Sequence, residues 1–233
     1  MAPKDLKTPF RWETRQVMLA DRVLFVPKHY SDYNQFTLPP WEHHTLFGNT
    51  NPVRVEYCSG HGHWIIEKAL QNPTSNWVAV EIRFDRVRRI WSKLKNHNLS
   101  NLLICCGDGR TITREYFPKA SVDEVFVNFP DPWPKTCHAK HRLIQPPFIE
   151  ECARILKEGA QINLVTDDAP YSKQMIKVVS QNPCFESPLS DTSSLKNVEG
   201  YGGSFFFDLW KKEGRTIHHL PFKRTNELLG EQI

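Results

Sequence analysis

Short apolar segments bounded by turn residues alternate along this chain with segments of helical spacing. The apolar segments predict strands at residues 53–57, 77–81, 102–106, 122–128 and 160–166. Helices are predicted at residues 64–71, 83–96, 110–117, 146–156 and 171–181. Strand followed by helix, repeated in this way, requires right-handed crossovers between parallel strands. The sequence therefore predicts an open parallel α/β sheet with helices on both faces.

This order changes near the C-terminus. Residues 204–210 and 216–222 both resemble strands, and the five residues between them include Gly214, which favours a β-hairpin. A hairpin that closes a five-stranded parallel sheet gives a seven-stranded, mostly parallel sheet. This plan resembles the Rossmann-like fold of the Class I S-adenosylmethionine-dependent methyltransferases, a likeness of fold that does not by itself specify chemistry. Residues 1–50 are interpreted as an irregular N-terminal extension and residues 51–233 as the methyltransferase domain.

Composition limits the class of protein. Hydrophobic residues make up 39% of the 233 positions, enough to build a globular core. No segment approaches the roughly 20 apolar residues of a membrane helix, and the N-terminus lacks the apolar run of a signal peptide, so we expect a cytoplasmic protein with no membrane association. The net charge of +4 identifies no partner. Basic residues nevertheless concentrate at 83–95, 135–142 and 211–224, which favours a polyanionic partner over three separate solvated surfaces.

The first predicted strand ends in a glycine-containing turn, VEYCSGHGHW. Gly60 and Gly62 allow the backbone to approach a ligand closely. If they began a dinucleotide-binding fingerprint, its third glycine would be Ile65, which disfavours NAD. The methyltransferase pattern E-x-G-x-G-x-G matches at Glu56, Gly60 and Gly62 but has Cys58 at its first glycine. An ordinary glycine turn is the alternative interpretation.

Two carboxylates follow the next strands, at the edge of the sheet where ligands bind in such folds. Glu81 ends the second strand, where a carboxylate can accept hydrogen bonds from the two hydroxyls of a ribose. Asp108, in CGDGR after the third strand, can accept from an adenine amino group. An Asp between two glycines is also a common turn former, which remains the alternative for Asp108.

The segment after the fourth strand, VNFPDPWPKTCHAKHRLI, carries the most specific pattern. Prolines alternate with other residues there and stiffen the backbone. An anionic Asp131 can face a cationic sulfonium, Trp133 can stack on a base, and Lys135 can bind a phosphate or a base edge. A rigid loop with a packed tryptophan is the alternative. Asp167 follows the fifth strand at the same predicted edge.

The same segment contains potential metal ligands. Cys137, His138 and His141 are residue types that bind zinc, but the sequence offers no fourth ligand beside them. We therefore expect no metal site.

On these motifs, residues 45–224 resemble the bacterial tRNA (guanine-N7-)-methyltransferases, the TrmB family, most specifically in PDPWPK followed by H-x-K-x-R-L-I. The resemblance implies that S-adenosylmethionine binds at the positions of Glu56, Gly60, Gly62, Glu81, Asp108 and Asp131. It also implies that Asp131 is the catalytic aspartate and that Lys135 and Asp167 bind substrate.

The family also carries T-x-[FY]-E with a glycine ten residues after the threonine, and Ser204 to Gly214 reproduces that spacing. Ser204 replaces the threonine, Phe207 stands at the glutamate position, and Asp208 follows it. The resemblance makes all three candidate substrate-binding residues. Either Asp208 takes over from the glutamate by a small shift, or this contact is lost.

The resemblance implies methyl transfer from S-adenosylmethionine to N7 of guanosine 46 in the variable loop of tRNA. Guanine N7 has a lone pair and no proton, so the enzyme chiefly supplies alignment and electrostatic stabilisation, and Asp131 acts more as a positioner than as a strong base.

Two other functions stay open. One is methylation of an exocyclic amine, because N-F-P-D-P-W is similar to the proline-rich loop of amino methyltransferases. The other is a noncatalytic RNA-binding domain, with Cys58 and Phe207 as signs of decay. The expected partner is tRNA, bound by a monomer or homodimer without an obligate protein partner.

Overall fold

The computed structural model describes residues 1–28, 32–189 and 194–225. The chain divides into two compact units. Unit 1 comprises Met1–Pro118 together with Gly202–Phe205, and unit 2 comprises Lys119–Tyr201 together with Phe206–Ile233.

Unit 1 is built on strands in the order β1-β2-β5-β4-β3, of which β2, β5, β4 and β3 are parallel and β1 is antiparallel to β2. The strands are β1 (Met18–Ala20), β2 (Val23–Phe25), β3 (Val53–Tyr57), β4 (Asn76–Glu81) and β5 (Leu102–Cys106). The helices are α1 (His63–Gln71), α2 (Phe84–Asn96) and α3 (Gly109–Tyr116), with short 3₁₀ helices η1 (Pro3–Asp5), η2 (Trp12–Thr14) and η3 (Tyr33–Gln35).

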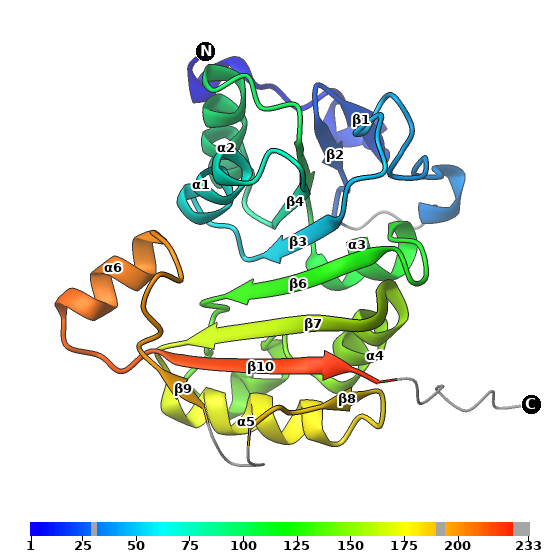
Figure 1. Ribbon diagram of the computed structural model, residues 1–233. Coiled ribbons are helices and arrows are strands. Elements are labelled where there is room, and N and C mark those ends of the chain that lie inside the picture. The colour runs from blue at the N-terminus through cyan, green and yellow to red at the C-terminus, as the bar shows by residue number, and fades with distance from the viewer. Residues whose placement is uncertain (29–31, 190–193, 226–233) are drawn as a thin grey trace, which may run out of the picture. The chain divides into compact units, whose positions relative to one another are not determined.

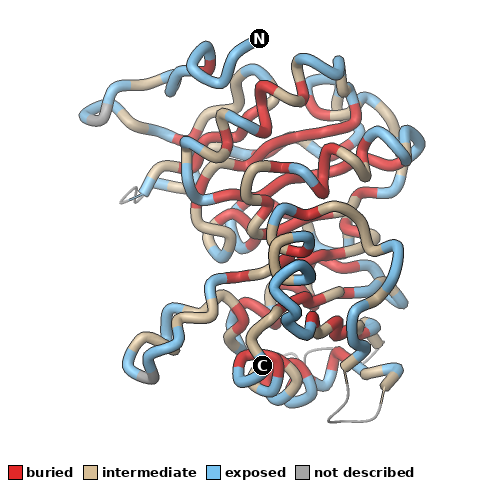
Figure 2. The backbone as a smooth tube through the Cα atoms, turned by 90° about the vertical axis from the view of Figure 1, so that its left-hand side faces the viewer, coloured by how far each residue is buried: buried red, intermediate tan, exposed pale blue. Residues whose placement is uncertain are grey.

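The central strands of unit 1 are buried, as Figure 2 shows. All six residues of β4 are buried, which is typical of a parallel strand covered on both faces. The helices α1 and α2 pack on each other and on β4 (Figure 1). Because Tyr57 pairs with Val80 and Glu81 with Cys106, the three central strands end at the same edge. The turns that follow them are therefore brought together.

Unit 2 contains β6 (Val122–Asn128) parallel to β7 (Leu156–Thr166), with β10 (His218–Arg224) antiparallel to β7. The two-residue strands β8 (Phe185–Glu186) and β9 (Leu195–Lys196) pair with β10. The helices are η4 (Thr136–His141), α4 (Pro146–Ile155), α5 (Ala169–Ser180) and α6 (Phe205–Lys212). The helix α4 packs on β7, and α5 packs on β7 and β10 (Figure 1).

The strand and helix predictions are confirmed through residue 180, with differences at the ends of elements. Three strands match their predicted bounds, and β4 begins one residue earlier, at Asn76. The strand β7 begins at Leu156, four residues before its predicted start, and its register shifts between Val122 and Glu124 of β6.

The predicted strand at residues 204–210 is wrong. This segment forms the helix α6, so the expected hairpin does not exist. Helical spacing brings Phe206 and Trp210 into a stacked pair with ring centroids 6.1 Å apart, and Phe207 is buried on the helix. A short apolar run does not by itself distinguish strand from helix, and packing decides the outcome here. The C-terminal half of the predicted hairpin is confirmed as β10, which pairs with β7.

The interpretation of residues 1–50 as irregular is also wrong in part. The strand β2 extends the parallel sheet by pairing with β5, with Phe25 opposite Cys106. Trp41 is 6% exposed and packs edge-on against Phe117 at a centroid distance of 5.4 Å. These residues complete the core of unit 1. A domain boundary at residue 50 stays a prediction.

None of the helices in the described part of the chain combines the length and apolar character needed to cross a membrane.

Gly62 should be the less replaceable of two glycines with the same backbone conformation. Gly62 and Gly214 have φ values of 74° and 72°, so alanine is strained at both. A β-carbon at Gly62 would also lie 2.8 Å from Cγ1 of Ile90, whereas nothing lies within 4 Å of one at Gly214. We expect Gly62→Ala to lower the free energy of unfolding by about 2–4 kcal/mol and Gly214→Ala by about 1–2 kcal/mol. Equal losses in urea denaturation would contradict this packing.

Candidate functional site

The turn after β3 is left-handed at alternate residues. Cys58, Gly60 and Gly62 have φ values of 62°, 55° and 74°. The methyltransferase pattern E-x-G-x-G-x-G has glycine at all three positions. The structure explains why, since only glycine adopts this conformation without strain. Cys58 keeps the conformation at a cost of roughly 1–2 kcal/mol. The departure at Cys58 therefore preserves the course of the turn.

Glu81 connects this turn to the start of α2. Its side chain is buried, and the residue is 3% exposed. Oε2 accepts a hydrogen bond from the backbone N–H of Gly60 at 2.8 Å, and Oε1 accepts from that of Arg83 at 2.9 Å. Burial raises the pKa of Glu81, and these N–H groups and Arg86, 3.7 Å from Oε2, only partly oppose it. A carboxylate has about four lone-pair sites, so acceptor capacity remains for a ligand.

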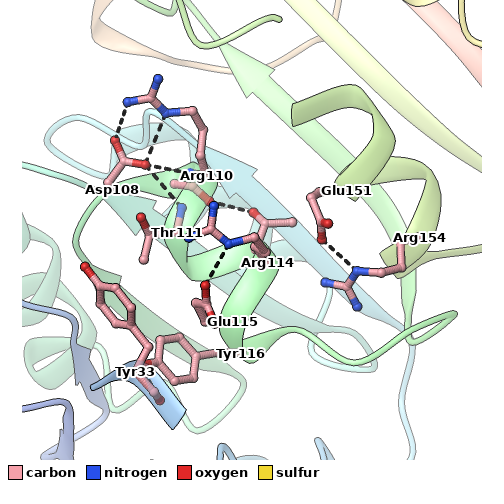
Figure 3. Close-up of polar contacts among 11 residues, drawn as sticks. Tyr33, Asp108, Arg110, Thr111, Arg114, Glu115, Tyr116, Glu151 and Arg154 are labelled. Atoms are coloured by element: carbon pink, nitrogen blue, oxygen red, sulfur yellow. Dashed lines mark hydrogen bonds and ion pairs between the residues drawn. The ribbon is translucent and has the colours of Figure 1, made fainter. Parts of the chain in front are cut away.

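Asp108 is the N-cap of α3, and Figure 3 shows its contacts. Oδ1 accepts from the backbone N–H groups of Arg110 and Thr111 at 3.0 and 3.2 Å. The Arg110 side chain also binds both carboxylate oxygens, at 3.2 and 2.9 Å. Burial by itself raises the pKa of Asp108, but the Arg110 contacts and the N–H groups outweigh it and lower the pKa. Asp108 is thus both a turn former and an oriented acceptor, and Arg110 is a neighbour that the sequence did not single out.

These residues fit a nucleoside cofactor. Glu81 is a buried carboxylate of the kind that can accept hydrogen bonds from ribose hydroxyls, and Asp108 is a carboxylate that follows the adjacent strand. Gly60 and Gly62 provide backbone without side chains at the N-terminus of α1. Glu56, on β3, is 1% exposed, and its role in binding the cofactor stays a prediction.

In unit 2, the loop after β6 is held in a strained conformation. Phe129 and Trp133 have φ values of 49° and 41°, which bulky residues rarely adopt. Oδ1 of Asp131 accepts a hydrogen bond from the backbone N–H of Trp133 at 3.0 Å. Asp131 and Lys135 are exposed, as residues that meet a substrate should be. The imidazoles of His138 and His141 flank the Trp133 ring, with centroids at 5.6 and 5.3 Å.

Arg142 connects this loop to the helix α5. Its Nε donates to the carbonyl of Pro132 at 2.6 Å, and its guanidinium also binds the Gln174 side chain and lies 4.9 Å from the centroid of the Tyr171 ring. Arg142, the last residue of the basic segment 135–142, therefore has a structural role in holding the loop in place. Strained backbone that the surroundings hold in place is common at functional sites.

Asp167, after β7, is paired with a residue that the sequence did not predict. Arg215 donates to its Oδ2 at 2.7 Å, and the Arg215 guanidinium lies 3.7 Å from the centroid of the Trp210 ring. Their separation of 48 residues left no local signal for this contact.

The remaining candidates differ in their surroundings. Ser204 is 9% exposed, and its backbone N–H donates to the carbonyl of Gly202 at 3.0 Å. Phe207 packs in an apolar cluster with Val165 and Ile217, which makes it a core residue and argues against a direct substrate contact. Asp208 is exposed. Phe207 stands at the family's glutamate position and Asp208 follows it, and of these two residues Asp208 is the one exposed to solvent.

Within residues 1–28, 32–189 and 194–225, no group of three or more His, Cys, Asp or Glu side chains is placed to bind a metal ion.

Comparisons with known proteins show which proteins this chain is similar to. Residues 50–218 match the model of a family described as Putative methyltransferase. The chain is 46% identical over 222 residues to the tRNA (guanine-N(7)-)-methyltransferase of Chlamydia felis, covering 95% of this chain and 97% of that protein. It is 45% identical over 223 residues to the protein of the same name from Chlamydia muridarum, with the same coverage of each chain, 95% and 97%.

Solved structures show the fold. The crystal structure of the 16S rRNA methyltransferase KamB matches with a TM-score of 0.56 at 15% identity, covering 77% of this chain and 90% of that chain.

Glu81 should govern cofactor affinity. Hydrogen bonds to a buried carboxylate contribute roughly 1.5–3 kcal/mol, so Glu81→Gln should weaken S-adenosylmethionine binding about ten- to a hundredfold by calorimetry. Asp85→Asn is the matched control, because Asp85 is an exposed carboxylate four residues on that pairs with Arg83. Affinity should also fall as the pH drops towards the raised pKa of Glu81, since protonation removes acceptor capacity. Equal affinities for Glu81→Gln and the native protein would exclude the ribose contact.

Proposed function

Because the chain belongs to the methyltransferase family whose model matches residues 50–218, we propose that it transfers a methyl group from S-adenosylmethionine to N7 of a guanosine in tRNA. The observation that carries the substrate and the atom is the identity of 46% to a tRNA (guanine-N(7)-)-methyltransferase over 95% of this chain. The fold is that of the Class I S-adenosylmethionine-dependent methyltransferases, as the sequence predicts. Position 46 of the variable loop is the proposed site of modification.

In this proposal unit 1 holds the cofactor. Glu81 accepts from the ribose hydroxyls, and Asp108 accepts from the adenine amino group. Gly60 and Gly62 admit the ligand close to the backbone. When bound, S-adenosylmethionine supplies an electrophilic methyl group on a positively charged sulfur.

Unit 2 supplies the residues for the base. Guanine N7 attacks with an existing lone pair, so no side chain needs to remove a proton first. The Asp131 carboxylate is oriented by the N–H of Trp133 and faces outward, where it can stabilise the positive charge that grows on the guanine ring. Lys135 binds the substrate RNA, and Asp167 accepts from N–H groups of the base. Asp208 is a further proposed substrate contact of this unit, and Ser204, which belongs to unit 1, is proposed as another.

The setting follows from the substrate. We propose a cytoplasmic enzyme that acts on tRNA as a monomer or homodimer. Methylation of an exocyclic amine remains the second candidate, because the loop NFPDPW is similar to that of amino methyltransferases.

Replacing Asp131 and Lys135 should separate catalysis from binding. Asp131→Ala should lower kcat far more than it weakens tRNA affinity, because its contribution arises in the transition state. Lys135→Ala should chiefly weaken tRNA affinity, by roughly 1–3 kcal/mol for a charge-assisted contact. Single-turnover rates and filter binding on both variants measure the two effects. If both changes affect affinity alone, the loop binds RNA without taking part in the transfer.

The methylated atom can be identified with a tRNA that carries 7-deazaguanosine in the variable loop. This base has a C–H group at position 7 and keeps its exocyclic amine, N1 and O6. Binding should change little, and methyl transfer should vanish because no lone pair remains to attack the methyl group. Continued transfer to the substituted base would exclude N7 and support the exocyclic-amine reaction.

A further inference from the structure

Arg215 and Asp167 form an unusual arrangement in unit 2. The central carbon of the Arg215 guanidinium lies 3.7 Å from the centroid of the Trp210 ring, and Nη1 donates to Oδ2 of Asp167 at 2.7 Å. Glu213 lies 3.5 Å from Nε of Arg215. The Arg215 side chain is 47% exposed and that of Asp167 is 14% exposed. A planar group with N–H donors therefore lies over an aromatic ring, and one of its donors binds a partly buried carboxylate.

A guanine base has the same chemical features. Its N1–H and N2–H groups form a planar pair of donors along the Watson–Crick edge, and its ring stacks on aromatic side chains. The guanidinium of arginine is a planar set of N–H donors that also stacks on aromatic rings. The two groups can thus use the same carboxylate and the same ring, but not at the same time.

The Trp210 ring is itself supported from within unit 2. It stacks on Phe206 at a centroid distance of 6.1 Å and an interplanar angle of 19°. Phe206 in turn contacts Phe129 at 6.2 Å, and Phe129 precedes Asp131 in the strained loop by two residues. A row of aromatic rings therefore connects the Arg215 position with the loop that carries Asp131.

We propose that, in the absence of RNA, the Arg215 guanidinium occupies the place where the substrate guanine binds. The base binds Asp167 through its N–H groups, stacks on Trp210, and displaces the guanidinium to do so. This inference rests on the proposed function, since it takes guanine in RNA as the ligand. It assigns Trp210 as the stacking residue and Arg215 as a competitor that affects only RNA whose base binds Asp167.

Removing Arg215 should change the affinity for tRNA in the direction opposite to that expected for the loss of a positive charge. A group that occupies a binding position lowers the apparent affinity in proportion to the fraction of molecules left competent. Removing Arg215 should therefore tighten tRNA binding, although it removes a positive charge. We expect Arg215→Met to lower the Kd for tRNA by up to about tenfold at about 0.3 M salt, where a single exposed charge contributes little.

Lys212→Met is the matched control, because it removes the same charge from the exposed end of α6. It should leave the Kd unchanged or raise it. If Arg215→Met raises the Kd or leaves it unchanged, the proposal is overturned. Restoration of a raised Kd by Arg215→Lys would identify Arg215 as an ordinary phosphate contact.

The identity of the base provides a second test. With a tRNA that has adenosine in place of the acceptor guanosine, the gain in affinity of Arg215→Met should disappear, because adenine N1 is an acceptor and cannot bind a carboxylate. A gain of equal size with adenosine would overturn the assignment of guanine to this position.

Trp210 can be tested by its aromatic character. Trp210→Phe should keep most of the native affinity for tRNA, and Trp210→Leu should raise the Kd about tenfold or more. Equal values for the two variants would overturn the stacking role. All these readouts are affinities, so failure of the proposed function would appear separately, as the absence of 7-methylguanosine after incubation with the native protein.

Discussion

The Glu81 carboxylate connects the two turns on which the proposed cofactor site of unit 1 depends. It accepts hydrogen bonds from the backbone N–H groups of Gly60, after β3, and of Arg83, before α2. Because Glu81 is buried, each of these bonds is shielded from water, and the left-handed course of residues 58–62 is fixed against the end of β4. The same carboxylate thus shapes the site and retains capacity to bind a ribose. This explains how the turn tolerates Cys58 at a position where glycine is free of strain.

In unit 2, an arginine side chain and not a buried carboxylate fixes the conformation of the loop that carries the candidate catalytic residue. The loop after β6 has left-handed residues at Phe129 and Trp133, and its conformation is maintained by Arg142, which binds the carbonyl of Pro132. Methyl transfer to guanine N7 requires alignment more than proton transfer, and a stiff loop supplies alignment. The prolines, the Asp131 turn and the Arg142 clamp all restrict where the Asp131 carboxylate points. We infer that the rigidity of this loop contributes to methyl transfer by keeping the Asp131 carboxylate aligned.

Local patterns predicted most of the fold and most of the candidate positions. Buried parallel strands such as β4 are continuous apolar runs, and topology then places the residues after them at one edge. The helix α6 was missed because its apolar run is too short to distinguish the two periodicities, and β2 because it has three residues. The pairing of Arg215 with Asp167 joins residues far apart in the sequence, and the pairing of Arg110 with Asp108 requires the N-cap geometry of α3. Neither leaves a pattern in the sequence.

The chemical identity of the methylated nucleoside tests the proposed function most directly. Purified protein should be incubated with labelled S-adenosylmethionine and unmodified tRNA, and the tRNA digested to nucleosides and separated by chromatography with mass detection. We expect the label to appear in 7-methylguanosine and to map to the variable loop. Label in N2-methylguanosine, or no label in the tRNA while the protein binds the cofactor, would contradict it.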